Sequence, residues 1–144
     1  MHRPFLPVAI FAALVSVGSA CVGGTEGTGL PRNSLSWVEG IVTDTLGQAV
    51  VAAAIRPGEF AYRCDTGELA SPPLTGLGAT GSQGDYFLEI VTPAAVDRDL
   101  CVDLVVIPAG EAPQVFQDVA VVFTIPSDPV TTTVDLVYGS DPGA

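Results

Sequence analysis

The chain has 144 residues, which is room for one ordinary domain. It carries 16 acidic residues and five basic ones, all of them arginine, so its formal net charge is −11. That charge excludes a nucleic-acid-binding protein, because nothing in the chain could neutralise a run of phosphates. Hydrophobic residues make up 48% of the chain, which excludes a disordered acidic tail.

The first twenty residues are typical of an export signal. Met1 to Arg3 is a short basic start, and an apolar run follows from Val8 to Gly18. A membrane-spanning helix needs about 20 apolar residues, so this run is too short to remain as an anchor. Small residues then lead to Cys21. We expect residues 1–20 to be a signal peptide that is removed on export.

Small residues directly before a cysteine resemble the lipobox of bacterial lipoproteins, although Gly18 stands where that family usually has leucine. The resemblance implies that Cys21 is lipidated and becomes the new N-terminus, with more than one acyl chain for durable attachment to the membrane. Val22 follows, rather than the aspartate that holds many Gram-negative lipoproteins at the inner membrane. We therefore expect the outer membrane of a bacterial cell envelope. The alternative is ordinary cleavage after Ala20, which leaves Cys21 as a free thiol.

The segment after this cysteine is typical of a tether. Residues 22–34 are rich in glycine, serine and threonine and have no apolar periodicity, so we expect a flexible tether over residues 21–35. Removal of residues 1–20 leaves four arginines and 16 acids, a mature charge of −12. Such a charge repels anionic headgroups, so we expect the domain to stand off the bilayer.

Cys64 and Cys101 remain as an even pair if Cys21 carries lipid. In an exported protein we expect them to form a disulfide. Cys101 would then point out of its strand towards residues 57–79, a long excursion that the bridge would hold against the sheet. Closing a loop of this length constrains the unfolded chain by roughly 4 kcal/mol. The alternative is two separately buried free thiols.

From residue 36 onward the pattern is strand, turn, strand, with no long amphipathic window for a helix. Apolar alternation or short apolar runs predict strands over 37–44, 49–55, 86–91, 100–107, 115–123 and 131–138. In the 100–107 strand, the residues expected to face inward are Leu100, Val102, Leu104 and Val106. Short strands separated by Gly, Pro and Asp favour an all-β sandwich over residues 36–139, followed by a tail over 140–144.

Two short motifs occur in this region with a characteristic order and spacing. They are Val38-x-Gly40-x-Val42-x-Asp44-x-x-Gly47-x-x-Val50 and Thr80-x-x-x-Gly84-x-Tyr86-x-Leu88. They resemble the carboxypeptidase regulatory-like domains, which are transthyretin-like (prealbumin-like) β-sandwiches, although the proline and glycine usual after the first motif are missing. The resemblance implies a seven-stranded Greek-key sandwich, turn glycines at Gly40, Gly47 and Gly84, and Tyr86 in the core. It also implies a non-catalytic accessory domain.

Enzymes of related fold need residues that this chain lacks. Intradiol dioxygenases bind iron through His and Tyr pairs, but the only histidine is His2, within the signal peptide. The 5-hydroxyisourate hydrolases end in Tyr-Arg-Gly-Ser, whereas 138–140 is Tyr-Gly-Ser without the arginine. Serine and threonine nucleophiles have no histidine partner, and a zinc carboxypeptidase needs a further domain and its ligands. We therefore expect no enzyme and no cofactor.

A metal site is not expected either. Asp97, Asp99 and Asp103 lie close in sequence around Arg98, and calcium sites often use such clusters. The glycine-bearing spacing of an EF-hand is absent, so we prefer a solvated loop in which an aspartate forms a local ion pair with the arginine. Two cysteines in a disulfide and one under lipid leave none for zinc.

Two functions remain open. The first is a non-catalytic, lipid-anchored module with a structural, adhesive or assembly role. The second is a carbohydrate- or peptide-binding module that uses residues 57–79 and the adjacent loops. Trp37, Phe60 and Tyr62 could form its stacking patch, or could simply cover the core. The expected partners are the membrane, through the lipid, and an envelope protein or glycan, and not nucleic acid.

Overall fold

The computed structural model describes residues 33–141, so the predictions for the signal peptide and Cys21 lie outside the described residues. Within this range the protein is all-β and has eight strands. They are β1 (Ser34–Asp44), β2 (Ala54–Tyr62), β3 (Gly78–Ala79), β4 (Asp85–Thr92), β5 (Asp99–Ile107), β6 (Gln114–Val122), β7 (Thr131–Thr133) and β8 (Leu136–Tyr138). Residues 33–141 include no helix that could cross a membrane.

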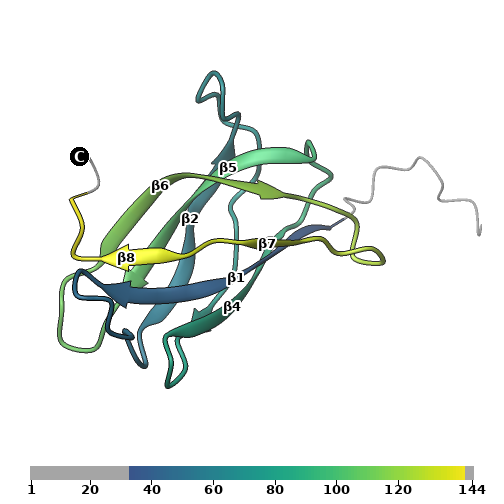
Figure 1. The fold of residues 1–144 in the computed structure, drawn as a ribbon. Helices are drawn as coiled ribbons and strands as arrows, with labels where there is room; N and C mark the ends of the chain where they lie inside the picture. The colour runs from purple at the N-terminus through teal and green to yellow at the C-terminus, as the bar shows by residue number, and fades with distance from the viewer. Residues whose placement is uncertain (1–32, 142–144) are drawn as a thin grey trace, which may run out of the picture. The chain divides into compact units, whose positions relative to one another are not determined.

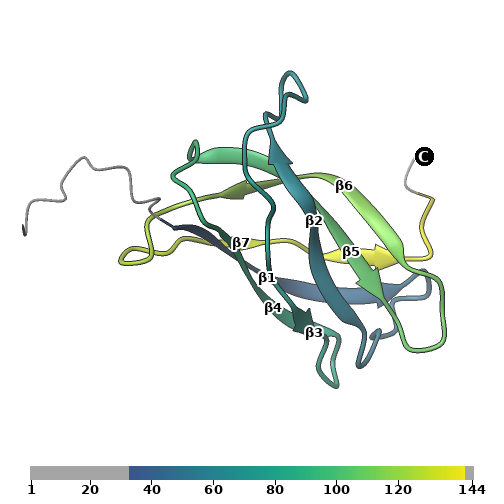
Figure 2. The same cartoon turned by 180° about the vertical axis from the view of Figure 1, so that it is seen from behind.

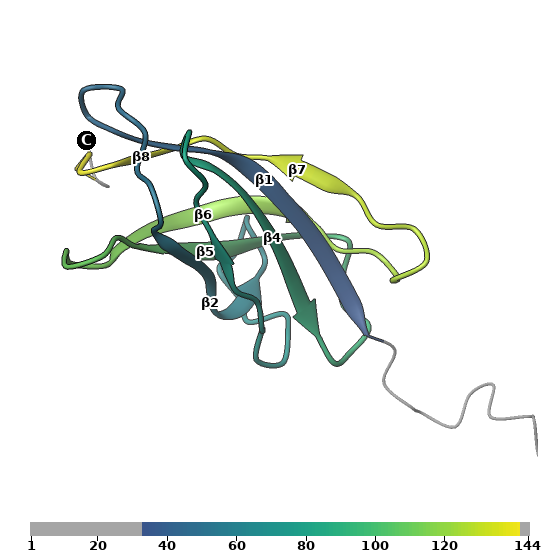
Figure 3. The same ribbon diagram turned by 90° about the horizontal axis from the view of Figure 1, so that it is seen from below.

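The strands form two sheets. In the first, β1 lies between antiparallel β4 and parallel β7, and β8 also pairs with β1 in parallel. The second sheet has the order β3-β2-β5-β6 (Figures 1 and 2). Figure 3 shows β1, β7 and β8 in one layer and β2, β5 and β6 in the other. This is the sandwich arrangement that the sequence predicts.

Buried apolar side chains from both sheets meet between the layers. The largest of the fully buried ones are Val38 and Val42 of β1, Ile55 of β2, Leu88 and Ile90 of β4, and Leu100, Val102, Leu104 and Val106 of β5. The β5 residues are those predicted to face inward. Burying each such side chain stabilises the fold by about 1.5–3 kcal/mol, so this interior is the main source of stability.

The second strand differs from its prediction. The run over 49–55 was expected to be a strand, but β2 begins only at Ala54 and continues through Pro57. The earlier residues cross between the sheets: Val50 N donates to Val42 O in the first sheet, whereas Ala52, with φ of 55°, donates to Thr80 O. Pro57 is tolerated because the pairing of β2 with β5 becomes irregular directly after it.

The last predicted strand, over 131–138, is interrupted between β7 and β8. At the interruption the Asp135 side chain replaces the main chain as a partner of β1, because its Oδ1 accepts a hydrogen bond from Ile41 N at 2.9 Å. The Tyr86 hydroxyl donates to Val134 O at 2.6 Å from inside the sandwich. Tyr86 is buried, as the resemblance implied.

The three predicted turn glycines divide into two kinds. Gly47 and Gly84 lie in turns with φ of 76° and 78°, which L-residues with a side chain rarely adopt. Gly40 was expected at a turn and instead lies inside β1. A Cβ at that position would overlap the carbonyl oxygen of Val134 and lie 2.6 Å from its carbonyl carbon. Gly40 therefore allows a close approach of two backbones.

The excursion over 57–79 returns along the side of the sandwich and connects the two sheets. β3 pairs with β2 of the second sheet, while Thr75 exchanges two backbone hydrogen bonds with Val91 of β4, at 2.8 and 2.9 Å. A Cβ on Gly76 would lie 2.5 Å from the Glu89 carbonyl oxygen, and one on Gly78 would lie 2.6 Å from that of Phe87. Glycine at these positions lets the returning chain lie against the edge of β4.

Candidate functional site

The predicted disulfide is present between Cys64 and Cys101, with the two Cα atoms 5.1 Å apart. Cys101 is buried on the side of β5 that faces away from the core, between the inward-facing Leu100 and Val102. Cys64 lies in the exposed turn that follows β2. The bridge therefore holds the start of the excursion against the second sheet, and the alternative of two free thiols is wrong.

The stacking patch that Trp37, Phe60 and Tyr62 could have formed is absent. Trp37 lies on β1 of the first sheet, whereas Phe60 and Tyr62 lie on β2 of the second. Phe60 and Tyr62 do line one hollow of about 300 Å³, together with Glu59, Leu69, Gly67 and Asp103. The excursion thus has a small hollow of its own, without the tryptophan.

Asp103 lies between two irregularities of the second sheet. The pairing register of β5 shifts beside it both towards β2 and towards β6. The Tyr62 hydroxyl donates to Asp103 Oδ1 at 2.6 Å and lies 3.2 Å from Asp118 Oδ1. Burial, and then the hydrogen bond to Asp103, raise the pKa of Tyr62 above its ordinary value. Asp118 itself has φ of 59°, so a residue other than glycine adopts the left-handed backbone conformation at the bulge in β6.

An aromatic pair lies on the outer face of the first sheet. The rings of Trp37 and Phe87 meet edge to face, with centroids 5.5 Å apart and an interplanar angle of 68°. Trp37 Nε1 donates to Glu89 Oε2 at 2.9 Å, which fixes the indole. Phe87 remains 49% exposed. Phe87 was not singled out from the sequence, although the inward alternation of Tyr86 and Leu88 already places it on the outer face.

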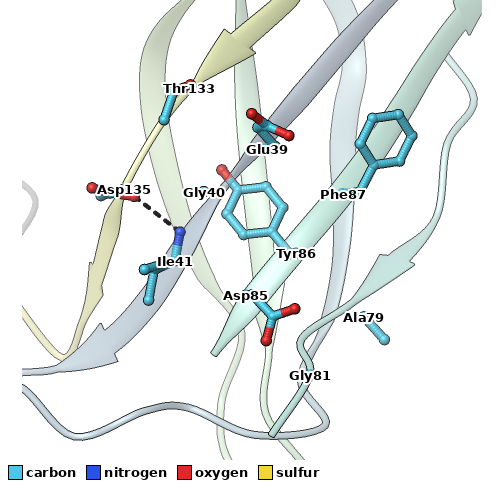
Figure 4. A pocket seen from close by; sticks show the side chains of 10 residues that line it. All are labelled: Glu39, Gly40, Ile41, Ala79, Gly81, Asp85, Tyr86, Phe87, Thr133 and Asp135. Carbon is cyan, nitrogen blue, oxygen red and sulfur yellow. Dashed lines mark hydrogen bonds between the residues drawn. The ribbon is translucent and has the colours of Figure 1, made fainter. Parts of the chain in front are cut away.

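Next to this pair is a hollow of about 700 Å³ with acidic walls (Figure 4). Its lining includes Glu39 and Ile41 of β1, Asp85 and Phe87 of β4, and Thr133 and Asp135 from the β7–β8 segment. The Asp135 carboxylate is used by Ile41 N. Glu39 and Asp85 form no side-chain hydrogen bond or ion pair with another residue of the described chain, so their carboxylates are free for a ligand.

The arginines of the described chain lie elsewhere. Arg56 is on β2, Arg98 precedes β5, and Arg63 pairs with Asp97 at 2.8 Å. The partner of Asp97 is thus Arg63 and not the neighbouring Arg98, while Asp103 accepts a hydrogen bond from the Tyr62 hydroxyl. Within 33–141, no three His, Cys, Asp or Glu side chains are grouped as metal ligands.

The Tyr-Gly-Ser sequence near the C-terminus has a structural explanation. The Tyr138 hydroxyl donates to Ala112 O at 2.7 Å. The Gln114 side chain accepts from Gly139 N at 2.7 Å and donates to Ser140 O at 2.9 Å. These bonds fasten the end of β8 to the start of β6.

Comparison with models of known protein families, with curated proteins and with solved structures finds no match for this chain.

Proposed function

We propose that this protein is a non-catalytic, lipid-anchored module of a bacterial cell envelope, with a structural, adhesive or assembly role. The observation that carries the proposal is the Cys64–Cys101 disulfide. Such bonds form and persist in oxidising compartments outside the cytosol. The bridge also leaves Cys21 as the odd cysteine, at the position where a lipoprotein would carry its lipid.

The strand arrangement supports the finer assignment of the fold. We propose a seven-stranded, transthyretin-like Greek-key sandwich of the carboxypeptidase regulatory-like kind. If β7 and β8 are counted as one interrupted strand, the sheets contain three and four strands. The first and last strands of the chain lie side by side and parallel, and the second sheet carries the intervening β2, β5 and β6.

The chemistry of the described residues supports a role without catalysis. Residues 33–141 contain no histidine, and both of their cysteines are in the disulfide. Burial raises the pKa of Tyr86, as it does that of Tyr62, which keeps both phenols protonated. A phenol that acts as a nucleophile or base near neutral pH needs the opposite shift.

Fractionation of a Gram-negative host that expresses the full chain tests the anchor and its address. We expect wild type in the outer-membrane fraction and Val22→Asp in the inner-membrane fraction. Cys21→Ala, which cannot carry the lipid, should be missing from the outer-membrane fraction. Val51→Asp is the matched control, since it adds the same charge at an exposed position and should leave the wild-type distribution unchanged. Wild type and Cys21→Ala in the same soluble fraction would contradict the proposal.

A second candidate function is binding of a carbohydrate or peptide at the excursion. The observation in its favour is the hollow that Phe60, Tyr62 and Asp103 line beside the two bulges. An aromatic ring can stack on a sugar face, and a carboxylate beside it can accept hydrogen bonds from the sugar hydroxyls. A glycan array with wild type and Phe60→Ala tests it: a hit that the variant loses supports the site, and a hit that survives the substitution excludes it.

A further inference from the structure

On the outer face of the first sheet, apolar and acidic side chains alternate both along each strand and from one strand to the next. We call the six residues concerned the acidic–aromatic face: Trp37, Glu39 and Ile41 of β1, and Asp85, Phe87 and Glu89 of β4. In the antiparallel register Trp37 lies opposite Glu89, Glu39 opposite Phe87, and Ile41 opposite Asp85. Every carboxylate of this face therefore has an apolar neighbour across the strands.

Such a face is chemically suited to a cation. A guanidinium group forms paired hydrogen bonds with a carboxylate and also stacks on an aromatic ring. Glu39 and Asp85 have no partner within the described chain, and Asp135 adds a third negative charge to the same hollow. These carboxylates give the hollow a negative charge, which a cationic ligand would neutralise and a neutral ligand would not.

The arginines of residues 33–141 lie away from this face. Arg56, Arg63 and Arg98, which are all the arginines within 33–141, belong to β2 and to segments that flank the second sheet. Arg63 is already paired with Asp97. None of these three arginines supplies the face with a complementary charge, which a partner protein could bring.

We propose that the acidic–aromatic face binds an extended, arginine-rich segment of a partner protein. Arginines at alternate positions of an extended chain lie on one side and about 6.6 Å apart. Glu39 and Asp85 lie on neighbouring strands and are offset by the same two residues along the strand direction, because Asp85 lies opposite Ile41. One arginine pairs with Glu39 and stacks on Phe87, and the next pairs with Asp85. The inference rests on the proposed role in assembly, and it names the class of partner.

The test is binding of a fluorescein-labelled peptide with four Arg-Thr repeats, followed by anisotropy at 150 mM salt. The protein is the full chain as purified from its host, in nonionic detergent, whether or not it carries lipid. Failure of the lipid anchor and failure of peptide binding are thus separate results. The same peptide with citrulline in place of arginine keeps the shape and removes the charge, and we expect at least tenfold weaker binding.

Matched variants distinguish binding at this face from general attraction of the peptide to an acidic protein. Glu39→Gln with Asp85→Asn should weaken binding at least tenfold, whereas Glu111→Gln with Asp128→Asn removes the same charge elsewhere and should change it less than twofold. Phe87→Ala should weaken binding about fivefold, and Leu46→Ala, at another exposed apolar position, should not. Thermal unfolding of each variant confirms that it is folded.

Two results would overturn the proposal. One is equal weakening by the two charge-removing pairs, which would show that the peptide follows net charge and not this face. The other is no binding of the arginine peptide by a folded protein, with or without binding of a neutral probe such as chitohexaose.

Discussion

Gly40→Ala is the substitution that the structure makes most costly for its size. A methyl group at Gly40 would overlap the carbonyl oxygen of Val134 and lie 3.1 Å from Asp135 Oδ1. The neighbouring backbone has to retreat. Three hydrogen bonds converge there: Tyr86 Oη to Val134 O at 2.6 Å, Val134 N to Glu39 O at 2.7 Å, and Ile41 N to Asp135 Oδ1 at 2.9 Å.

The magnitude follows from those bonds. At about 0.5–1.5 kcal/mol each, their loss lowers the free energy of unfolding by about 3 kcal/mol. Gly47→Ala is the matched control, because it adds the same methyl group in open space at φ of 76°. Its cost comes from the left-handed backbone alone, about 1–2 kcal/mol.

Urea unfolding of both variants measures the difference, with the m-value showing whether the transition has kept its character. Tyr86→Phe removes only one of the three bonds, so it gives a readable loss of about 1 kcal/mol even if Gly40→Ala does not fold. If Gly40→Ala loses no more stability than Gly47→Ala, the close approach of β1 to Val134 is not what requires a glycine.

Three further predictions concern the bridge, the excursion and the pH dependence. Cys64→Ala with Cys101→Ala should lower the free energy of unfolding by up to about 4 kcal/mol; reductant added to wild type should do the same, and no response to reductant would argue against the bridge. Gly78→Ala should displace the returning chain from β4 and speed amide hydrogen exchange at Val91, whereas exchange as slow as in wild type would contradict the tight approach. The pKa of Tyr86 is raised by burial and by the charge of Asp135, so the phenol loses its proton at lower pH in the unfolded chain than in the folded one. The contribution of Tyr86 to the free energy of unfolding is therefore fully present below about pH 10 and falls above it. Urea midpoints between pH 8 and 11 should therefore fall less steeply in Tyr86→Phe, and an identical slope would show that another group titrates.

Much of the fold could be predicted from the sequence because the apolar alternation is regular in strands that line the core, such as β5. In β5, Leu100, Val102, Leu104 and Val106 all face the core as expected. The same alternation left Cys101 on the opposite side, where it meets Cys64. Local pattern and long-range contact agree in this strand.

The second strand was misplaced for a physical reason. A run of small apolar residues over 49–55 is equally compatible with a strand and with a crossover between the sheets. The choice is made by Thr80, whose backbone and side chain bond Ala52 and Ala53 from a distant part of the chain. Pro57 then sits inside a strand because the neighbouring register is irregular. Neither contact is visible in the local sequence.

The candidate site was only partly foreseen. Trp37 was identified as a possible stacking residue, but its partner is Phe87 across the strands and not Phe60 or Tyr62. Which aromatic residues meet depends on which strands pair, because alternation alone gives the face and not the neighbour. Gly40 shows the same limit, since its role is set by Val134, almost a hundred residues further along the chain.

The intact mass of the membrane-extracted protein tests the central claim most directly. The full chain is expressed in a Gram-negative host, extracted in detergent, and its N-terminal peptide is sequenced by mass spectrometry. We predict a chain that begins at Cys21, carries the added mass of more than one acyl chain there, and keeps the Cys64–Cys101 bridge. A water-soluble product that begins at Cys21 without acyl mass, or one that retains residues 1–20, would contradict the account.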